Sequence, residues 1–375
     1  MTFIISKKVI SEALQIIAKT LSPKNVLPIL DCIVFKVEGN ELQLTAADPE
    51  NMMTMTVNTD EADGQGDFAV NAKNIIEAVK NLPEIPVRFN TDEEGIVKIT
   101  YQNGMFTLPT YPTCEFPAMT GLGEITVCFN IHEDVLQENI ARTVFAAAND
   151  ELRPVMNTVC FDLTTESLNI VASDGHQLVR NRIMTISTND ANTGEILLPV
   201  KPSMILKNLL GRCDGEVHVE SDGRRAVITT EYFTLNSRIV EGRYPRYNSV
   251  IPLNNPYVAK VNRTQLLNIL KRTAPFANNA SNMIKLHVNT DCLRVETEDY
   301  DFNKAAKETM VCDYNGHEMT IGMKGTAIIE ILSNIKCEEV EFHFADPSRA
   351  ALIMPAEQPE GQEILMLQMP MLIND

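Results

Sequence analysis

Three aspartates recur at a nearly constant spacing and are the first candidates for acid or base chemistry. Asp48, Asp174 and Asp299 each follow an alternating run of apolar residues, and they lie 126 and 125 residues apart. Catalytic carboxylates work in unequal environments that hold their pKa values apart, and a position repeated three times lacks that asymmetry. An aspartate after a strand also shapes turns by accepting backbone hydrogen bonds. We therefore predict three turn-forming aspartates.

The middle aspartate lies in the stretch Ser173-Asp174-Gly175-His176, which permits two interpretations. Asp174 and His176 would suit a hydrolase, but the sequence offers no evident nucleophile or metal partner for them. Phosphate-loop, dinucleotide-binding, H-E-x-x-H and G-x-S-x-G motifs are all missing from the chain. The second interpretation is a shaped turn that lines a groove, because Gly175 allows close approach of the backbone. We favour the second interpretation and expect no catalytic residue and no cofactor.

The cysteines suggest neither a metal site nor a disulfide framework. They are scattered, with no C-x-x-C pair and no histidines at zinc-binding spacing. We expect free thiols, mostly buried, in the reducing cytoplasm, and no bound metal. The eight are Cys32, Cys114, Cys128, Cys160, Cys213, Cys292, Cys312 and Cys337.

Basic residues concentrate on six segments in which aliphatic residues recur with the helical period. The segments hold 14 basic and 6 acidic residues, a net charge of +8 that leaves −26 for the rest of the chain. Lysine and arginine suit any exposed helix face, which is one interpretation. The other is a positive lining that binds phosphates locally. The segments are 7–20, 72–82, 132–146, 201–212, 263–273 and 323–336.

The carboxyl end is rich in methionine and also permits two interpretations. It reads EILMLQMPMLIND, with Met366, Met369 and Met371 around Pro370. The methionines could fill gaps in the core beneath a last strand. The same flexible, polarizable side chains could instead line a surface pocket that accepts several peptides, with Pro370 ending the strand.

The elements that must position these residues repeat three times along the chain. Strand-like segments at 41–53, 167–179 and 292–304 share their apolar positions, and the helical segments recur in step with them. One unit reads helix, strands, helix, strands, which predicts an α+β fold with helices on one face of antiparallel sheets. Gly-, Pro- and Asn-containing linkers place the domains at 1–124, 125–253 and 254–375.

Length and composition bound the class of protein. The 375 residues are 44% hydrophobic, which is typical of a globular chain. No apolar run approaches the roughly 20 residues that span a bilayer, and the amino end does not resemble a signal peptide, so we expect no membrane association. The formal charge of −18, taken alone, argues against nucleic-acid binding.

Four motifs in their order along the chain give a family resemblance. LPIL at 27–30, SDGHQL at 173–178, EGRYPRYNSVIP at 241–252 and MPM at 369–371, together with the three repeats, resemble the bacterial DNA polymerase III β subunits, the β sliding clamps. The resemblance implies a head-to-tail homodimeric ring of six domains around double-stranded DNA. Such a ring tethers the polymerase by topology, without sequence specificity, and catalyses nothing.

The resemblance also implies a pocket for partner peptides. DNA polymerase III catalytic subunit, clamp loader and other clamp-motif proteins would compete for it with extended peptides that carry apolar anchors. The matching positions are Met156, Ser173, Gly175, His176, Leu178, Pro245, Val250, Leu367, Met369, Pro370 and Met371. This chain has Gln177 and Leu372 where the family often has arginine, and Asn374 and Asp375 extend beyond its usual end.

Two further surfaces follow from the resemblance and the charge pattern. The expected dimer interface brings Phe106 and Leu108 of one protomer against Phe276 of the other. The expected DNA-facing cations are Lys19, Lys24, Lys73, Lys80, Arg142, Arg153, Lys201, Lys207, Arg212, Lys271 and Arg272. Besides the hydrolase, one alternative remains: a repeat scaffold that binds only proteins and turns its helix cations to solvent.

Overall fold

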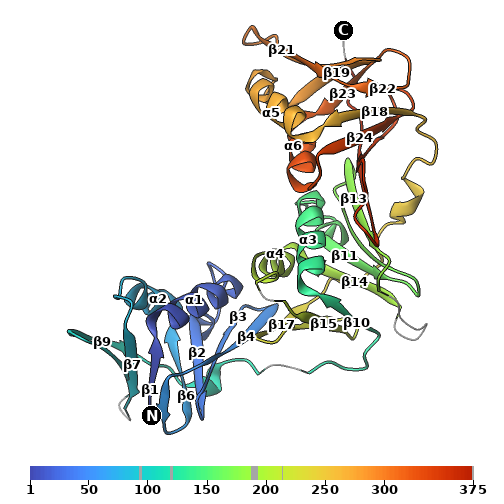
Figure 1. The fold of residues 1–375 in the computed structure, drawn as a ribbon. Helices are drawn as coiled ribbons and strands as arrows, with labels where there is room; N and C mark the ends of the chain where they lie inside the picture. The colour runs from blue at the N-terminus through green and yellow to red at the C-terminus, as the bar shows by residue number, and fades with distance from the viewer. Residues whose placement is uncertain (93–94, 119–120, 187–192, 213, 374–375) are drawn as a thin grey trace. The chain divides into compact units, whose positions relative to one another are not determined.

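The described residues, 1–92, 95–118, 121–186, 193–212 and 214–373, form two compact units in the computed structural model (Figure 1). The first unit comprises Met1–Leu136 with Ile205–Ile239, and the second comprises Gln137–Met204 with Val240–Asp375. The middle third of the chain therefore contributes strands to both units. None of the helices described is long and apolar enough to cross a membrane.

Antiparallel sheets dominate the first unit. Its eight-stranded sheet has the order β10-β15-β16-β17-β4-β3-β2-β6, and its five-stranded sheet has the order β5-β1-β7-β8-β9. Strand β4 pairs with β17, so a strand of the first repeat is joined directly to one of the second. The strands are β1 (Thr2–Ser6), β2 (Cys32–Glu38), β3 (Glu41–Ala47), β4 (Asn51–Asn58), β5 (Glu61–Asp63), β6 (Gly66–Asn71), β7 (Pro86–Thr91), β8 (Ile96–Tyr101), β9 (Gly104–Pro109), β10 (Val127–His132), β15 (Glu216–Ser221), β16 (Arg225–Thr229) and β17 (Phe233–Arg238).

The second unit is built in the same way. Its sheets have the orders β14-β11-β12-β13-β26-β25-β24-β18-β22 and β21-β20-β19-β23. Strand β13 of the second repeat pairs with β26 of the third. The strands are β11 (Thr158–Leu163), β12 (Leu168–Ser173), β13 (Gln177–Ile183), β14 (Gly194–Pro199), β18 (Tyr257–Asn262), β19 (Met283–Asn289), β20 (Cys292–Asp299), β21 (Lys304–Val311), β22 (Asp313–Tyr314), β23 (Met319–Lys324), β24 (Glu339–Phe344), β25 (Ala351–Pro355) and β26 (Gln362–Gln368).

The helices occur where the apolar period predicted them. In the first unit α1 packs against α2, and in the second α5 packs against α6. Asparagine side chains begin two of them: Asn71 Oδ1 accepts from Asn74 N (3.2 Å), and Asn262 Oδ1 accepts from Gln265 N (2.9 Å). The helices are α1 (Lys7–Ile17), α2 (Ala72–Lys80), α3 (Glu133–Thr143), α4 (Val200–Leu209), α5 (Arg263–Thr273) and α6 (Gly325–Asn334). The predicted α+β class is confirmed.

Burial follows from the alternation of side chains along the strands and the stripe on each helix. In the first unit Ile10, Leu14 and Ile17 of α1 are buried, and the helix contacts β3 and β4. In the second unit Leu270 of α5 and Ile331 of α6 belong to one large apolar cluster with the strands beneath them. The helices thus cover one face of antiparallel sheets and hold the loops at the sheet ends in place.

The aspartate prediction is confirmed at two of its three positions. Asp48 and Asp174 each follow a strand and accept backbone hydrogen bonds in a turn. Asp299 differs, because it is the last residue of β20 and pairs in register with Lys304. Both its carboxylate oxygens are buried without a hydrogen-bond partner among the described residues, so the prediction of a turn-forming side chain is wrong there.

The cysteines are free thiols wherever the structure describes them. Cys32, Cys160 and Cys312 are buried, three others are partly buried, and Cys114 is exposed. Cys213 lies outside the described residues. The prediction that the thiols are mostly buried holds for only three of the seven described cysteines.

Candidate functional site

The turn between β12 and β13 is the most closely bonded part of the predicted peptide pocket. Asp174 Oδ1 accepts from the backbone N–H groups of His176 (2.7 Å) and Gln177 (2.8 Å). Ser173 Oγ donates to the Gln177 carbonyl (2.7 Å) and accepts from Gly175 N (3.1 Å). Gly175 has φ +93°, which favours glycine. The side chains of Ser173 and Asp174 therefore shape the turn, in agreement with the turn interpretation rather than the hydrolase.

The same turn occurs a second time between β15 and β16, which sequence reasoning missed. Asp222 Oδ1 accepts from the N–H groups of Arg224 (2.9 Å) and Arg225 (2.8 Å). Ser221 Oγ donates to the Arg225 carbonyl (2.8 Å) and accepts from Gly223 N (3.1 Å). The repeated tripeptide Ser-Asp-Gly was the signal that could have found it.

The methionine-rich tail lies against the first of these turns. Strand β26 pairs with β13, with Leu367 opposite Leu178. Beyond the strand, Met369 N donates to the His176 carbonyl (2.8 Å). Met371 N donates to the Gly322 carbonyl (2.8 Å), and a Cβ on Gly322 would meet the Met371 carbonyl at 2.6 Å. Backbone hydrogen bonds on both sides of Pro370 therefore fix the course of the tail.

A second segment, 240–251, is held beside the same strands by polar contacts. Val240 N donates to the Leu197 carbonyl (3.0 Å), and Tyr244 N donates to Glu195 Oε2 (3.1 Å). Tyr247 donates its phenolic hydrogen to Asp162 Oδ2 (2.5 Å). Burial and the bond to this carboxylate raise the pKa of Tyr247 above its ordinary value, so the phenol stays a donor.

These segments enclose one apolar cluster with a partly exposed edge. Leu178, Leu367, Tyr244 and Tyr247 are buried in it together, with Leu352 from β25. Val155, Val240, Ile251 and Met354 are partly buried and pack against this cluster. Of the eleven predicted pocket residues, the buried ones are Met156, Ser173, Leu178 and Leu367, the half-buried ones are Pro370 and Met371, and the exposed ones are Gly175, His176, Pro245, Val250 and Met369.

The three departures from the family pattern fall in different surroundings. Gln177 is buried in β13, opposite Gln368 of β26. Leu372 is 86% exposed beside the tail. Asn374 and Asp375 lie outside the described residues.

Most of the predicted DNA-facing cations are exposed, and some have local partners. Arg272 forms two hydrogen bonds to Glu308 (2.9 and 2.6 Å), and Arg153 donates to Asp150 Oδ2 (2.8 Å). The glutamate and aspartate neutralise part of the positive charge that the sequence count assigned to these segments. The exposed cations are Lys19, Lys24, Lys73, Lys80, Arg153, Arg212, Lys271 and Arg272, and the half-buried ones are Lys201 and Lys207.

Arg142 is a correction to the predicted DNA-facing set. It is 5% exposed, its Nη2 donates to Glu138 Oε2 (2.6 Å) and its Nη1 donates to Gln362 Oε1 (3.2 Å). A guanidinium buried in this way cannot contact a phosphate. Helical spacing suggested an exposed cation, but the second partner lies 220 residues away and left no local signal.

The predicted interface residues lie beside strands that end their sheets. Phe106 and Leu108 are on β9, the last strand of the five-stranded sheet, and Phe106 is 37% exposed. Phe276 is on a short 3-10 helix (Ala274–Phe276) and is 41% exposed. This helix contacts β21, the edge strand of the four-stranded sheet.

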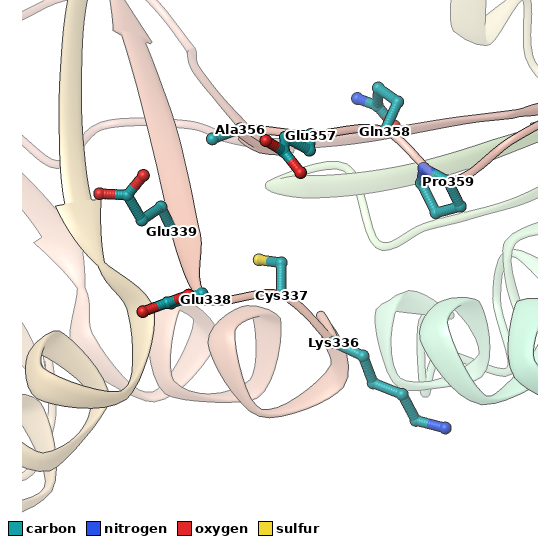
Figure 2. Close-up of a pocket in the computed structure, with 8 residues that line it drawn as sticks. All are labelled: Lys336, Cys337, Glu338, Glu339, Ala356, Glu357, Gln358 and Pro359. Atoms are coloured by element: carbon teal, nitrogen blue, oxygen red, sulfur yellow. The ribbon is translucent and has the colours of Figure 1, made fainter.

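One pocket of about 400 Å³ contains none of the predicted site residues (Figure 2). It lies between the segment 336–339 that enters β24 and the segment 356–359 that follows β25. Three glutamates and Cys337 line it, namely Glu338 and Glu339 from the first segment and Glu357 from the second, and in Figure 2 the carboxylates of Glu338 and Glu339 point away from Cys337. Glu339 already pairs with Lys260 (2.7 Å).

Sequence profiles of one family match nearly the whole chain. The profile of the DNA polymerase III beta subunit N-terminal domain matches residues 1–120, that of its central domain matches 130–246, and that of its C-terminal domain matches 248–371. Three consecutive matches in the family's own order repeat the threefold pattern of the sequence.

Whole relatives and solved structures agree with these profiles. The beta sliding clamp of Pseudomonas aeruginosa is 28% identical over 369 residues, covering 98% of this chain and 99% of the relative. That of Haemophilus influenzae is 26% identical over 374 residues, with the same coverage. A crystal structure of the P. aeruginosa clamp bound to griselimycin has a TM-score of 0.93 at 27% identity, with both chains fully covered. The DNA polymerase III beta subunit of Thermotoga maritima has a TM-score of 0.88 at 26% identity, again with full coverage.

Proposed function

The chain belongs to the DNA polymerase III beta subunit family, the β sliding clamps, and on this premise we propose which of its surfaces bind partners, DNA and a second copy. It is the processivity factor of DNA polymerase III and a non-catalytic subunit, so its function is binding. Polymerase and DNA are its partners as a member of this family.

The cluster around Leu178 and Leu367 is the proposed peptide pocket. The observation that carries this assignment is a buried apolar cluster with exposed apolar residues on two of the segments that form it. Backbone hydrogen bonds hold both of these segments in place. Val250 is 59% exposed and Met369 is 41% exposed. Because backbone hydrogen bonds hold both segments before binding, an extended peptide loses less free energy in ordering the protein. Peptides of the polymerase catalytic subunit, the clamp loader and other clamp-motif proteins would compete for this pocket.

Replacing Val250 with serine tests the pocket against a control of the same residue type. A peptide from the polymerase III catalytic subunit should bind Val250→Ser about 10-fold more weakly in calorimetric titration, because the apolar side chain at the pocket edge is removed. Val26→Ser changes a 93% exposed valine in the first unit and should leave the affinity unchanged. Equal affinity in wild type and Val250→Ser would contradict the assignment.

The exposed helix cations are the proposed DNA contacts. Lys80, Arg212 and Lys271 come one from each repeat, are exposed and lie at or beside helix carboxyl ends. A sliding ring needs contacts with phosphates and no base readout, since base contacts would fix its position. The acidic remainder of the chain, at −26, repels DNA elsewhere.

Removing these three charges should weaken retention on duplex DNA and flatten its salt dependence. The slope of log affinity against log salt should become shallower by about 0.9 for each phosphate that the variant no longer neutralises. A charge-matched control, Lys36→Ala with Arg224→Ala and Arg349→Ala, removes exposed cations outside the six helices. If the control has the same effect as the Lys80, Arg212 and Lys271 variant, general charge accounts for retention and the lining does not.

A head-to-tail homodimer is the proposed assembly. Strand β9 in the first unit and β21 in the second each end a sheet, and two unlike edges suit a heterologous contact that closes into a ring. Phe106→Asp should lower the mass of the particle in sedimentation toward one chain. Met105→Asp is the matched control, because Met105 is 58% exposed and points to the other side of β9. Both variants remaining dimeric would exclude this interface.

The remaining assignments rest on the family. We propose domains at 1–124, 125–253 and 254–375, with the strand pairs β4–β17 and β13–β26 joining neighbours. We also propose that the protein acts in the cytoplasm, where free thiols such as those described above persist.

A further inference from the structure

Strands β10 and β15 bring three potential metal ligands to one face of the first unit's eight-stranded sheet. In the antiparallel register Cys128 stands opposite Glu220, and Asn130 stands opposite His218. The alternate residues on both strands, such as Phe129 and Val219, are buried. Side chains alternate along a strand, so Cys128, Asn130, His218 and Glu220 share the opposite, partly exposed face.

The ligand atoms of three of these residues converge. Cys128 Sγ lies 3.9 Å from His218 Nε2, and His218 Nε2 lies 3.3 Å from Glu220 Oε1. All three ligand atoms lie within 4.8 Å of one another. A tetrahedral zinc ion with bonds of about 2.0–2.3 Å separates its ligands by about 3.3–3.7 Å, so only small side-chain adjustments are needed.

Asn130 fixes the imidazole in the orientation that a metal requires. His218 Nδ1 lies 2.5 Å from Asn130 Oδ1, and an amide oxygen can only accept a hydrogen bond. The proton is therefore on Nδ1, and in the neutral ring the Nε2 lone pair faces the thiol and the carboxylate. Two acceptors at 3.3 Å attract each other only when a cation or a proton lies between them. Histidines that bind metals usually have such a partner on the other ring nitrogen.

We propose that Cys128, His218 and Glu220 bind a zinc ion, with water as the fourth ligand. Thiolate and imidazole favour zinc over the oxygen-seeking magnesium and calcium ions. Binding forms bonds from Sγ, Nε2 and a carboxylate oxygen to the metal and releases the thiol proton to solvent. The ion would tie the edge strand β10 to its neighbour β15, at the start of the second repeat. None of these three residues belongs to the surfaces proposed above.

Cobalt substitution tests the site without any measure of clamp activity. Adding Co²⁺ to the metal-free full chain should produce a thiolate-to-metal charge-transfer band and the intense visible bands of tetrahedral Co²⁺, and Zn²⁺ should abolish them. Cys128→Ser should remove the charge-transfer band, and Glu220→Gln should weaken metal binding while keeping the side-chain shape. Asn130→Ala should weaken binding about 10- to 100-fold, as expected for a positioning residue.

Matched controls separate this site from adventitious binding. Cys292→Ser changes a partly buried thiol elsewhere, and His132→Ala removes the histidine at the end of β10, which pairs with Asp214. Neither should alter the spectrum. The proposal is overturned if wild type gives no charge-transfer band, or if the band survives in folded Cys128→Ser. It is equally overturned if saturating Zn²⁺ leaves the melting temperature of wild type unchanged. In that case His218 and Glu220 form an ion pair and bind no metal.

Discussion

The middle third of the chain contains the same five-residue turn twice, once in each unit, and the two turns have different neighbours. Ser173–Gln177 and Ser221–Arg225 have the same pattern of serine and aspartate hydrogen bonds. Both central glycines have positive φ, +93° and +83°. The first turn receives the tail through Met369 N, whereas the second receives the linker through a bond from Gly123 N to Asp222 Oδ2 (3.0 Å).

The difference shows that the Ser-Asp-Gly sequence specifies a backbone shape and leaves the function to the segment that lies on it. A catalytic role for Asp174 and His176 would make the second copy hard to explain, since Arg224 replaces the histidine there. The apolar tail gives the first turn a place in the proposed pocket. The second turn instead holds the linker between the first and second repeats, through the hydrogen bond from Gly123 N to Asp222.

Truncation after Gln368 is the change with the largest expected effect. It removes Met369, Pro370 and Met371 from the first turn, and the affinity for a polymerase peptide should fall at least about 100-fold, about 3 kcal/mol. Calorimetric titration measures the loss, and sedimentation should show an unchanged dimer. Asp222→Ala, which disturbs only the second turn, should bind the peptide like wild type. Retained affinity in the truncated chain would separate the tail from the pocket.

Removing the aspartate from either turn should have a similar effect on stability. Asp174→Ala leaves two backbone N–H groups without their acceptor, and Asp222→Ala leaves three, because Gly123 N also donates to Asp222. Each change should lower the free energy of unfolding by about 1–2 kcal/mol. Urea denaturation measures both changes. Only Asp174→Ala should also weaken peptide binding, because its turn supports His176 and the tail. Equal loss of peptide affinity in the two variants would contradict the division of roles.

Alanine at the central glycines should cost about 1 kcal/mol in each turn, because positive φ disfavours a side chain. A Cβ on Gly175 would lie 3.5 Å from Arg153 Nη1, whereas one on Gly223 meets nothing within 4 Å. Both are free of steric conflict, so thermal melting should report equal backbone strain. A much larger loss in Gly175→Ala would indicate that Arg153 cannot adjust.

The smallest expected effect is the dependence of stability on acid pH, which arises from the Asp222 carboxylate. Burial raises its pKa, but hydrogen bonds from the N–H groups of Gly123, Arg224 and Arg225 outweigh burial and lower the pKa below its ordinary 3.8. The stabilisation is therefore complete above the ordinary pKa and is lost as pH falls through the lowered one. The difference in unfolding free energy between wild type and Asp222→Asn should stay constant from about pH 7 to 5 and shrink below about pH 4. A difference that grows on acidification would reverse the sign of this linkage.

Local periodicity predicted the helices well, because a helix buries a stripe that its own sequence contains. The segment 263–273 agrees with α5 at both ends, and 72–82 and 323–336 differ from α2 and α6 by a few residues. The turn at Asp174 was also predictable, since its bonds reach only three residues along the chain.

Contacts between distant segments left no such signal. The partner of Arg142 at Gln362 and the convergence of Cys128 with His218 both depend on packing or strand register set over many residues. Asp299 matched its repeats in sequence, yet β20 continues through its position where β3 and β12 end. The peptide pocket, the DNA contacts and the interface remain predictions that the experiments above can decide.

The strand pairs β4–β17 and β13–β26 also affect folding during synthesis, because each joins strands that are far apart in the sequence. Strand β4 leaves the ribosome long before β17, and β13 can pair only after β26, the last strand among the described residues, has been synthesised. The first and second repeats therefore each have an unpaired sheet edge until the following repeat has been translated. A nascent chain stalled between residues 58 and 233 should be prone to aggregate through β4, and a holding chaperone would be most useful during that interval.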